Sequence, residues 1–248
     1  MTSSAERKLA VIGAGGFGRE TVEAVKALNA AGASWQIVGY LDEDPARHRT
    51  VIDEVPVLGG IEEAGNMPDV SIVVCTARPG NYASRARIVQ KLGLPPERYA
   101  TIIHPSASVA MTSKVGPGTV VLAQTVLTAA VRVGSHVAIM PHVTLTHDDV
   151  IGDFVSMAAG ACLGGNVRIG QCAYIGAGAR VREHCSIGTG ALVGMGAVVT
   201  RDVPAHEVWA GVPARCLRKS AAGGAASGGP LLDRPSTVRA SKLVPADE

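Results

Sequence analysis

The most regular feature of this chain is a six-residue spacing of aliphatic side chains. From Val109 to Val199, a Val, Leu, Ile or Met occupies every sixth position without interruption. In nearly every case the residue two positions earlier is Val or a small residue, and Gly follows many of the aliphatic residues. A period of six fits neither an α-helix, with about 3.6 residues per turn, nor the simple alternation of an uninterrupted strand.

This period predicts a parallel β-helix. Each hexad would supply one short strand and one turn, and stacked coils would bury a shared apolar column. The aliphatic residue and the residue two before it lie on the same side of a strand, so we expect both to point inward. The glycines that follow the aliphatic residues predict positive φ angles at the corners of each coil.

A different pattern precedes the hexads. The apolar run Lys8–Ile12 leads into Gly13-Ala14-Gly15-Gly16-Phe17-Gly18 and then into a helical pattern. Strand, glycine turn and helix together form a place where backbone N–H groups and a helix N-terminus can hold phosphate. The acidic run Asp42-Glu43-Asp44 follows the next strand, where a carboxylate would reach a ribose hydroxyl. Three further strands of a parallel sheet are predicted at residues 36–41, 70–76 and 99–103. A second helix is predicted at residues 81–92.

The glycine turn alone is typical of a nicotinamide or flavin dehydrogenase. Two features argue against that interpretation. The α/β part has only four predicted strands, about half of a complete dinucleotide-binding fold. The hexads then follow in place of a dehydrogenase catalytic domain. A dehydrogenase would bind NAD(P)H, which a fluorescence titration would detect.

Composition and charge further restrict the class of protein and its expected partners. The net charge is only +2, so nothing suggests a nucleic-acid or membrane-surface partner. The five Cys have no zinc-like spacing and are interpreted as reduced thiols of an intracellular protein; no metal is expected. Because the N-terminus lacks an apolar signal core and no run could span a bilayer, we expect a soluble cytoplasmic protein. Residues 219–248, rich in Ala, Gly, Ser and Pro, predict a disordered tail.

Residues 7–218 resemble the sialic-acid O-acetyltransferases and nucleotide-sugar N-acetyltransferases, typified by the bacterial UDP-4-amino-sugar acetyltransferase that makes diacetylbacillosamine. The resemblance rests on the glycine turn, the hexads, Thr146-His147-Asp148, the run from Gly164 to Gly170, and the closing Ala210-Gly211-Val212-Pro213-Ala214-Arg215. It implies a small Rossmann-like acceptor-binding domain at residues 1–104 and a left-handed β-helix acetyltransferase domain at residues 105–218. It also implies a homotrimer.

His147 is the candidate catalytic base. It is the second residue after Leu145, outside the inward-pointing pair, so its ring should face a groove. An imidazole titrates in the range needed to take a proton when a sugar amine or hydroxyl attacks a thioester. The resemblance gives His147 this role and gives Asp148 the role of increasing its basicity. The alternative interpretation is a solvated loop histidine.

The inward slot at Asp149 is unexpected, because a buried carboxylate is costly without partners. Either Asp149 is hydrogen-bonded and orients His147, or the corner is locally distorted. A coil of eighteen residues would also stack Asp148, Asn166 and His184 in one column, which would bring His184 near the site. Four histidines that lie on turns or after the coils are interpreted as structural or exposed: His136, His142, His184 and His206.

The resemblance also implies two substrate sites. Acetyl-CoA, as co-substrate, would lie in the groove between the β-helices of neighbouring subunits, with Gly165 as a backbone N–H donor to the thioester oxyanion. The implied cofactor-binding residues are Ser156, Gly165, Ala177, Met195 and Arg215. The implied acceptor-binding residues are Gly15, Gly16, Phe17, Asp42, Glu43, Thr76 and Met140. Phe17 replaces a histidine common in the nucleotide-sugar enzymes, and Met140 replaces an Asn of the typified enzyme, so the acceptor or its nucleotide is expected to differ. At the cofactor site, Ser156 replaces a histidine of the typified enzyme.

The sequence therefore predicts an acetyl-CoA-dependent acetyltransferase that acts on an amino or hydroxyl group of a sugar, free or nucleotide-linked, by direct attack. Two alternatives keep the fold and the chemistry: a sugar or sialic-acid O-acetyltransferase, and a transferase of another acyl group. A third is a non-catalytic, nucleotide-binding β-helix trimer, which would fail to bind acetyl-CoA. The sequence does not identify the acceptor.

Overall fold

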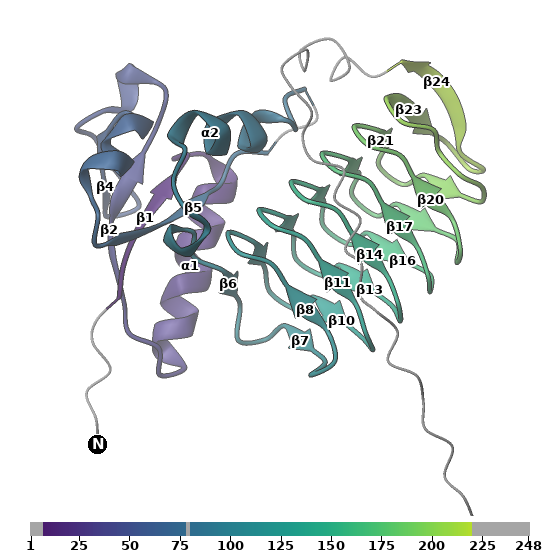
Figure 1. Cartoon of the computed structure of the whole chain (residues 1–248), viewed down its shortest axis with the longest axis horizontal. Helices are drawn as coiled ribbons and strands as arrows, with labels where there is room; N and C mark the ends of the chain where they lie inside the picture. The colour runs from purple at the N-terminus through teal and green to yellow at the C-terminus, as the bar shows by residue number, and fades with distance from the viewer. Residues whose placement is uncertain (1–6, 78–79, 220–248) are drawn as a thin grey trace, which may run out of the picture.

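The computed structural model describes residues 7–77 and 80–219. Within these residues the chain forms a small α/β domain followed by a β-helix, which lie side by side in Figure 1. The β-helix is left-handed, as the resemblance implied. The tail predicted for residues 219–248 lies outside the described residues, except for Lys219, which ends strand β24 (Arg215–Lys219).

The α/β domain is built on a five-stranded sheet with the order β3-β4-β2-β1-β5. All pairs are parallel except the β3–β4 hairpin. In chain order the elements are β1 (Arg7–Ile12), α1 (Gly16–Ala30), β2 (Trp35–Leu41), the 3₁₀ turn η1 (Pro45–Arg47), β3 (Val51–Ile52), β4 (Val55–Gly59), η2 (Ile61–Asn66), β5 (Val70–Val74), α2 (Ser84–Leu92) and η3 (Pro96–Arg98). The sequence analysis missed the hairpin because its turn residues, Asp53 and Glu54, adopt positive φ without the Asn-Gly or Asp-Gly pair that signals such turns.

Strand β1 lies inside the sheet and is buried on both faces. Leu9 and Val11 pack in the core that contains α1, whereas Ala10 and Ile12 pack in the core on the opposite face, beside α2. Burial on both faces explains why this strand is a continuous apolar run in the sequence. The α1 core also includes Ala138 of the β-helix, so α1 is packed between the sheet and the β-helix.

The fourth predicted strand, residues 99–103, is divided between the two parts of the molecule. Tyr99 forms an isolated parallel bridge with Ile72 of the α/β sheet. The next two residues that form a strand, Ile102–Ile103, are β6, which pairs with β9 (Val120–Val121) of the β-helix. The β-helix therefore begins at Ile102, slightly before the boundary expected at residue 105.

Three sheets form the three faces of the β-helix. The face that we call the domain face contains β6, β9, β12 (Ala138–Ile139), β15 (Ser156–Met157), β18 (Tyr174–Ile175), β21 (Leu192–Val193), β23 (Glu207–Ala210) and β24. The second face contains β7 (Ser108–Val109), β10 (Val126–Leu127), β13 (Thr144–Leu145), β16 (Cys162–Leu163), β19 (Arg180–Val181) and β22 (Val198–Val199). The third face contains β8 (Lys114–Val115), β11 (Arg132–Val133), β14 (Val150–Ile151), β17 (Arg168–Ile169) and β20 (Ser186–Ile187).

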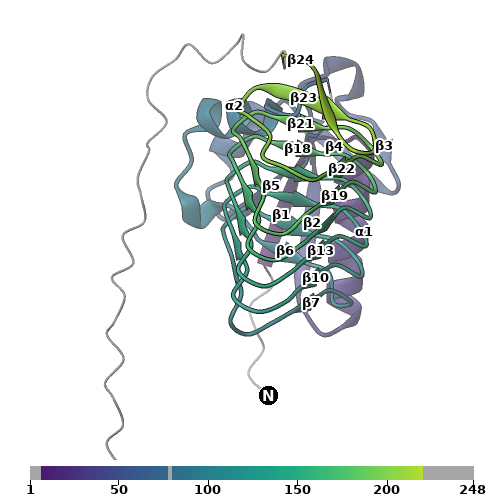
Figure 2. The same cartoon turned by 90° about the vertical axis from the view of Figure 1, so that its right-hand side faces the viewer.

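Each coil of the β-helix is three hexads long. Leu127 therefore pairs with Leu145 on the second face, eighteen residues later. The predicted inward pair is confirmed: Val143 and Leu145 are both 0% exposed. The α/β domain packs on the domain face, so in Figure 2, where β10 and β13 are toward the viewer, α1 and β1 lie behind the β-helix.

The prediction that the glycines after the aliphatic residues have positive φ is wrong. Positive φ occurs two residues later, as at Asn166 and Gly178. The glycines instead permit close stacking of the coils, since a Cβ on Gly176 would lie 2.5 Å from the backbone N of Met195 in the next coil. A residue without a Cβ is needed at such a contact.

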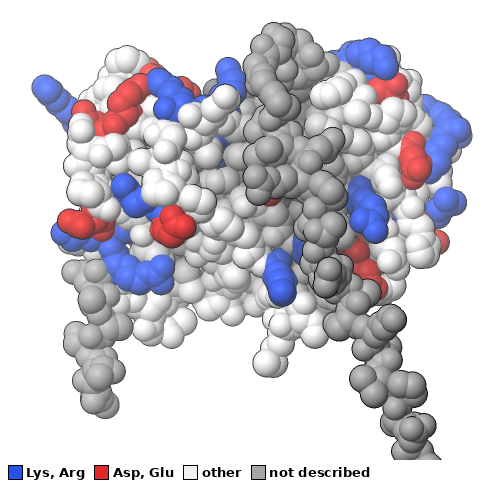
Figure 3. Space-filling view, in the orientation of Figure 1, with Lys and Arg blue, Asp and Glu red and all other residues white. Residues whose placement is uncertain are grey.

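Surface charges of both signs are mixed. On the face shown in Figure 3, Lys and Arg side chains are interspersed with Asp and Glu side chains, in keeping with the net charge of +2. This face therefore has no single-sign field of the kind that steers a polyanion. Among the described residues, no helix has the length and apolar character needed to cross a membrane.

One buried arginine joins the two parts of the molecule. Arg85 of α2 is 1% exposed. Its guanidinium donates five hydrogen bonds of 2.8–2.9 Å, to the carbonyls of Thr76, His136, Phe154 and Val155 and to Ser156 Oγ. These acceptors are neutral, and burial lowers the pKa of Arg85 to about 10, which still leaves the guanidinium charged at neutral pH. The interaction fixes α2 against the β-helix.

We expect Arg85→Met to lower the free energy of unfolding by at least about 1–3 kcal/mol, the penalty for one buried group left unsatisfied. Urea denaturation would measure the change. Arg87→Met is the matched control, because Arg87 lies two residues further along α2, is exposed and donates only to Asn81 Oδ1 among the hydrogen bonds described. Equal stability of the two variants would contradict the role assigned to Arg85.

Candidate active site

The turn that carries His147 forms the corner between the second and third faces. It connects β13, which ends at Leu145, to β14, which begins at Val150. In a three-sided coil this corner lies opposite the domain face, on which the α/β domain of the same chain packs. His147 is therefore directed away from that domain.

His147 and Asp148 form an exposed hydrogen-bonded pair. The His147 Nδ1 to Asp148 Oδ2 distance is 3.0 Å, and the side chains are 60% and 55% exposed. Asp148, Asn166 and His184 stack at one corner, with φ angles of 62°, 60° and 60°. The predicted column is thus confirmed, and it brings the backbone of His184 next to Gly165, to whose carbonyl its N–H donates.

The His147 ring lies over Gly165 of the next coil. A Cβ on Gly165 would overlap Nε2 and Cε1 of the imidazole. The residues equivalent to Gly165 in the preceding and following coils are His147 and Glu183, which both carry side chains. The backbone at this position therefore tolerates a side chain, and it is the His147 ring that leaves no room for one at Gly165. Gly165 is buried, and its N–H donates none of the hydrogen bonds found within the described residues. Its role as an oxyanion donor stays a prediction.

Asp149 is hydrogen-bonded, as the first of the two alternatives requires, and its orientation of His147 stays a prediction. The residue is 0% exposed. Its carboxylate accepts from Thr146 N–H and Val167 N–H, both at 2.8 Å. The corner is not distorted, because Asp148 has the same φ as the equivalent residues of the next two coils. Burial raises the pKa of Asp149 to about 6, and the two backbone hydrogen bonds oppose this rise.

Four other histidines, His136, His142, His184 and His206, are structural or exposed, as interpreted. His136 is buried, stacks on Phe154 at 5.1 Å between ring centroids, and packs edge-on against Tyr99. Burial lowers the pKa of His136 to about 4, so its ring is neutral at physiological pH. The rest are exposed at turns: His142, His184 and His206.

Two of the expected cofactor residues lie together at a different corner. Ala177 and Met195 stack between the domain face and the second face, where Gly196 N–H donates to the Ala177 carbonyl at 2.8 Å. The Met195 side chain is 78% exposed, and Arg215 is exposed on β24. Within one chain, the second face separates Ala177 and Met195 from His147.

Ser156 differs from the expectation of a cofactor contact. Its side chain is on the domain face, only 3% of the residue is exposed, and its Oγ accepts a hydrogen bond from Arg85. The position therefore belongs to the junction between the two parts of the molecule. A side chain already covered by the α/β domain has no surface to offer to a cofactor.

The α/β domain contains a cavity of about 560 Å³ at the carboxyl ends of β1, β2 and β5, within the usual range for small-molecule sites. The chain places β2 and β5 on opposite sides of β1, so the cavity lies at the point where the strand order reverses, where open α/β sheets bind ligands. The cavity brings together six of the seven expected acceptor residues: Gly15, Gly16, Phe17, Asp42, Glu43 and Thr76. The seventh, Met140, instead packs partly buried against the core around α1.

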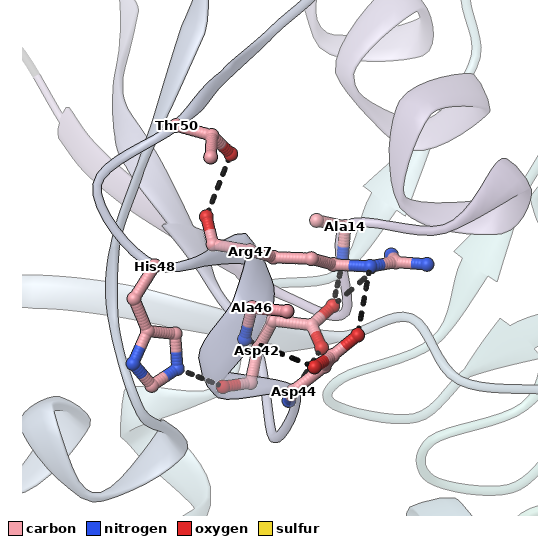
Figure 4. Close-up of polar contacts among 7 residues, drawn as sticks. All are labelled: Ala14, Asp42, Asp44, Ala46, Arg47, His48 and Thr50. Carbon is pink, nitrogen blue, oxygen red and sulfur yellow. Dashed lines mark hydrogen bonds and ion pairs between the residues drawn. The ribbon is translucent and has the colours of Figure 1, made fainter.

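Asp42 holds the glycine turn in place (Figure 4). Its carboxylate accepts from Ala14 N–H at 2.8 Å and from Asp44 N–H at 2.9 Å. Each carboxylate oxygen accepts one backbone N–H and can accept a second hydrogen bond, so the expected contact of Asp42 with a ribose hydroxyl stays a prediction. Glu43 is exposed at the same cavity.

Sequence reasoning missed three polar residues of the same cavity: Arg47, Asn81 and Ser84. Arg47 Nη1 lies 3.5 Å from Asp42 Oδ2, and its Nε lies 3.6 Å from Asp44 Oδ2. Ser84 Oγ donates to Thr76 Oγ1 at 2.9 Å. The sequence did contain a signal for Arg47: Asp44 followed by Pro45 is typical of a helix start, and such a start would return the chain toward the cavity. In the structure, Asp44 Oδ1 caps η1 by accepting from Ala46 N–H.

A left-handed β-helix of hexads with an exposed corner histidine, preceded by a small α/β domain, defines a hexapeptide-repeat acyltransferase. The family profile described as PglD N-terminal domain matches residues 8–92. The profile described as bacterial transferase hexapeptide (six repeats) matches residues 166–201. No curated protein sequence gives a significant match.

Solved structures identify the family. The acetyltransferase domain of PglB from Neisseria gonorrhoeae FA1090 is 35% identical, with a TM-score of 0.75 over 86% of this chain and 100% of that chain. PerB from Caulobacter crescentus, solved in complex with CoA and GDP-perosamine, is 27% identical, with a TM-score of 0.75 over 85% of this chain and 97% of that chain. WeeI from Acinetobacter baumannii AYE is 29% identical, with a TM-score of 0.73 over 85% of this chain and 100% of that chain. The chain belongs to the hexapeptide-repeat sugar acetyltransferases of the bacillosamine and perosamine type.

Proposed function

We propose that this enzyme transfers the acetyl group of acetyl-CoA to the amino group of a nucleotide-linked sugar. The observation that carries the proposal is the exposed His147–Asp148 pair, set over Gly165 at a corner of a hexapeptide β-helix. The PglB acetyltransferase domain from Neisseria gonorrhoeae FA1090 has been solved with acetyl coenzyme A, and PerB with CoA and GDP-perosamine. Both support the two substrates proposed here.

His147 acts as the general base in this proposal. A hydrogen bond from Nδ1–H to Asp148 leaves Nε2 as the basic atom. As the sugar amine attacks the thioester carbonyl, a C–N bond forms, the C–S bond breaks, and Nε2 takes the amine proton and then returns it to the departing thiolate. Because the amine attacks directly, no acyl-enzyme forms. The proposed oxyanion donor is Gly165 N–H.

The α/β domain, from the N-terminus to about residue 101, is the proposed acceptor domain. The first turn of α1 directs backbone N–H groups and the positive end of the helix dipole toward the cavity, which favours the phosphates of a nucleotide beside Gly15 and Gly16. Glu43 and Arg47 would contact the nucleoside. Phe17, which is 7% exposed, lines this cavity with an apolar ring where related enzymes have a histidine, so we infer a different acceptor.

The active form is proposed to be a homotrimer. The acceptor cavity lies on the domain-face side of the β-helix, whereas His147 lies at the opposite corner. One chain therefore cannot present its own acceptor to its own base, and the histidine corner of one subunit must meet the acceptor domain of another. Acetyl-CoA in the groove between two subunits would likewise reach His147 of one and Ala177, Met195 and Arg215 of the other. Since both substrates are cytoplasmic metabolites, the proposed location is the cytoplasm.

A substrate screen tests the function. We expect thiol release from acetyl-CoA with at least one of a panel of UDP-, dTDP-, GDP- and CMP-linked amino sugars, and none with free sialic acid. Acetylation of sialic acid alone would favour the O-acetyltransferase alternative. A preference for longer acyl-CoA donors would favour another acyl transfer. Failure to bind acetyl-CoA by calorimetry, in correctly folded protein, would contradict the proposal and favour a non-catalytic protein.

A further inference from the structure

The carboxylate of Asp149 is the only acidic group in its column of inward slots within the described residues, a column formed by Ser113, Val131, Asp149, Val167 and Cys185. Ser113 shows what a polar residue normally does there. Its Oγ accepts from the N–H of Val131, eighteen residues later, and donates to the Thr128 carbonyl. A hydroxyl thus accepts once and donates once, whereas a carboxylate can only accept.

Asp149 uses both of its oxygens as acceptors. Oδ1 accepts from Val167 N–H of the next coil, in the same manner as Ser113. Oδ2 accepts from Thr146 N–H, which immediately precedes His147 in the turn. A single buried carboxylate therefore ties the turn that carries His147 to the segment that contains Gly165.

These two segments are the ones that hold the imidazole. The ring is carried by residues 146–149 and rests on Gly165, and Asn166 N–H donates to the His147 carbonyl at 2.9 Å. Any change in the spacing between the segments moves Nε2 relative to Gly165. The carboxylate sets this spacing from the buried side, while Asp148 contacts the ring from the exposed side.

We propose that Asp149 is a positioning residue for His147, whose ionised carboxylate fastens the catalytic turn to the coil that supports the imidazole. This inference rests on the proposed function, in which His147 is the base. This role would also explain why a carboxylate occupies a buried slot in which a hydroxyl or an alkyl group would be less costly to bury.

The proposal has a consequence for pH dependence. Protonation would place an O–H where one of the two backbone N–H donors now points, so one of the two ties would be lost. Burial raises the pKa of Asp149 to about 6, so this loss is expected as the pH falls through about 6. The titratable groups that act on Asp149 are His147 and Asp148 of its own turn. The coils on either side bring Val131 and Val167 to the adjacent slots, and their arginines, Arg132 and Arg168, are exposed.

The test compares pH profiles of kcat/KM. We expect Asp149→Asn to lower kcat/KM on the order of 10–100-fold near neutral pH through misplacement of the base, with acetyl-CoA affinity unchanged. Below pH 6, log(kcat/KM) increases with pH, and the slope of this increase should be about 1 lower for the variant than for the wild type. The variant lacks the Asp149 carboxylate, whose deprotonation the wild type requires. Titration of the acceptor amine affects the wild type and the variants equally, so it does not contribute to the difference between their slopes.

Asp153→Asn is the matched control. Asp153 also accepts a backbone N–H with its carboxylate, that of Ser135 at 2.7 Å, but it lies beyond β14 at a different corner. This variant should keep the wild-type slope. Asp149→Ser is a second variant in case the Asn variant does not fold, because Ser113 shows that the column accepts a hydroxyl. It should show the same loss of slope as Asp149→Asn.

Different results would overturn the proposed function and the role of Asp149. Wild-type protein that binds no acetyl-CoA and acetylates no acceptor would overturn the proposed function. Active wild-type protein whose pH profile is shared by the Asp149 variants would overturn only the role of Asp149. Amide hydrogen exchange provides a readout that does not depend on turnover: exchange at Thr146 and Val167 should be faster in Asp149→Asn, and unchanged exchange would also contradict the proposal.

Discussion

His147→Ala is expected to lower kcat by about 10²–10⁴-fold, the contribution of a positioned general base. The loss follows from the geometry of the corner. His147 is 60% exposed and contacts Asp148 through Nδ1, so truncation leaves no buried group unsatisfied and no cavity in the core. The variant should therefore keep its fold and its affinity for acetyl-CoA. Thiol release measures the first quantity, and thermal unfolding and calorimetry measure the other two.

His184→Ala is the control for this experiment. His184 is exposed at the same corner, one coil beyond Asn166, and its side chain forms no hydrogen bond among those described. Its removal should leave kcat close to the wild-type value. Turnover of His147→Ala at the wild-type level would exclude His147 as the base, and an equal loss in both variants would indicate a general effect of the corner.

The β-helix was predictable because its defining contacts are local and periodic. A six-residue repeat with three hexads in each coil fixes the pairing of Leu127 with Leu145 and the inward position of Val143. The same register places the second residue after Leu145 outside the core, which is how His147 could be identified as exposed. One conclusion drawn from the repeat was wrong: the repeated glycines serve the packing of one coil against the next, and the period alone does not distinguish this need from a need for positive φ.

The α/β part was predicted less completely. The glycine turn and the acidic run after β2 located the cavity, and six expected residues do line it. What Asp42 does there depends on Ala14, twenty-eight residues earlier, and no local pattern specifies that contact. The hairpin β3–β4 was missed because its strands are short and its turn lacks Gly or Asn.

The junction between the two parts was not predictable from either part alone. Arg85 reads as an ordinary residue of an exposed helix until the carbonyls of the β-helix corner are brought to it. The same docking covers Ser156, which the repeat alone would leave on an outer face. Asp149 is an intermediate case: its slot in the repeat showed that a charge would be buried, but its two N–H partners become evident only when the turn and the next coil are in place.

Gly165→Ala is the second change with a large expected effect. Gly165 is not among the glycines with positive φ, so its backbone conformation accepts Ala, and the neighbouring Glu183 and His147 in the same column carry side chains. The added methyl group would overlap the imidazole. We expect the ring to be displaced and kcat to fall about 100-fold, the usual consequence of moving a catalytic group by about 1 Å. Because the imidazole is 60% exposed and can rotate toward solvent, the free energy of unfolding should change little.

A double-mutant cycle with His147→Ala separates this explanation from a general defect. Once the imidazole is absent, the methyl group meets no obstacle, and Gly→Ala at a compatible position stabilises by about 0.4–1 kcal/mol through the unfolded chain. The loss of kcat caused by Gly165→Ala should therefore disappear in the His147→Ala background, so the two effects on kcat should not add. Asn166→Ala, at the next residue, is the control and should behave the same in both backgrounds. Additive effects of His147→Ala and Gly165→Ala would mean that the imidazole does not rest on this glycine in solution.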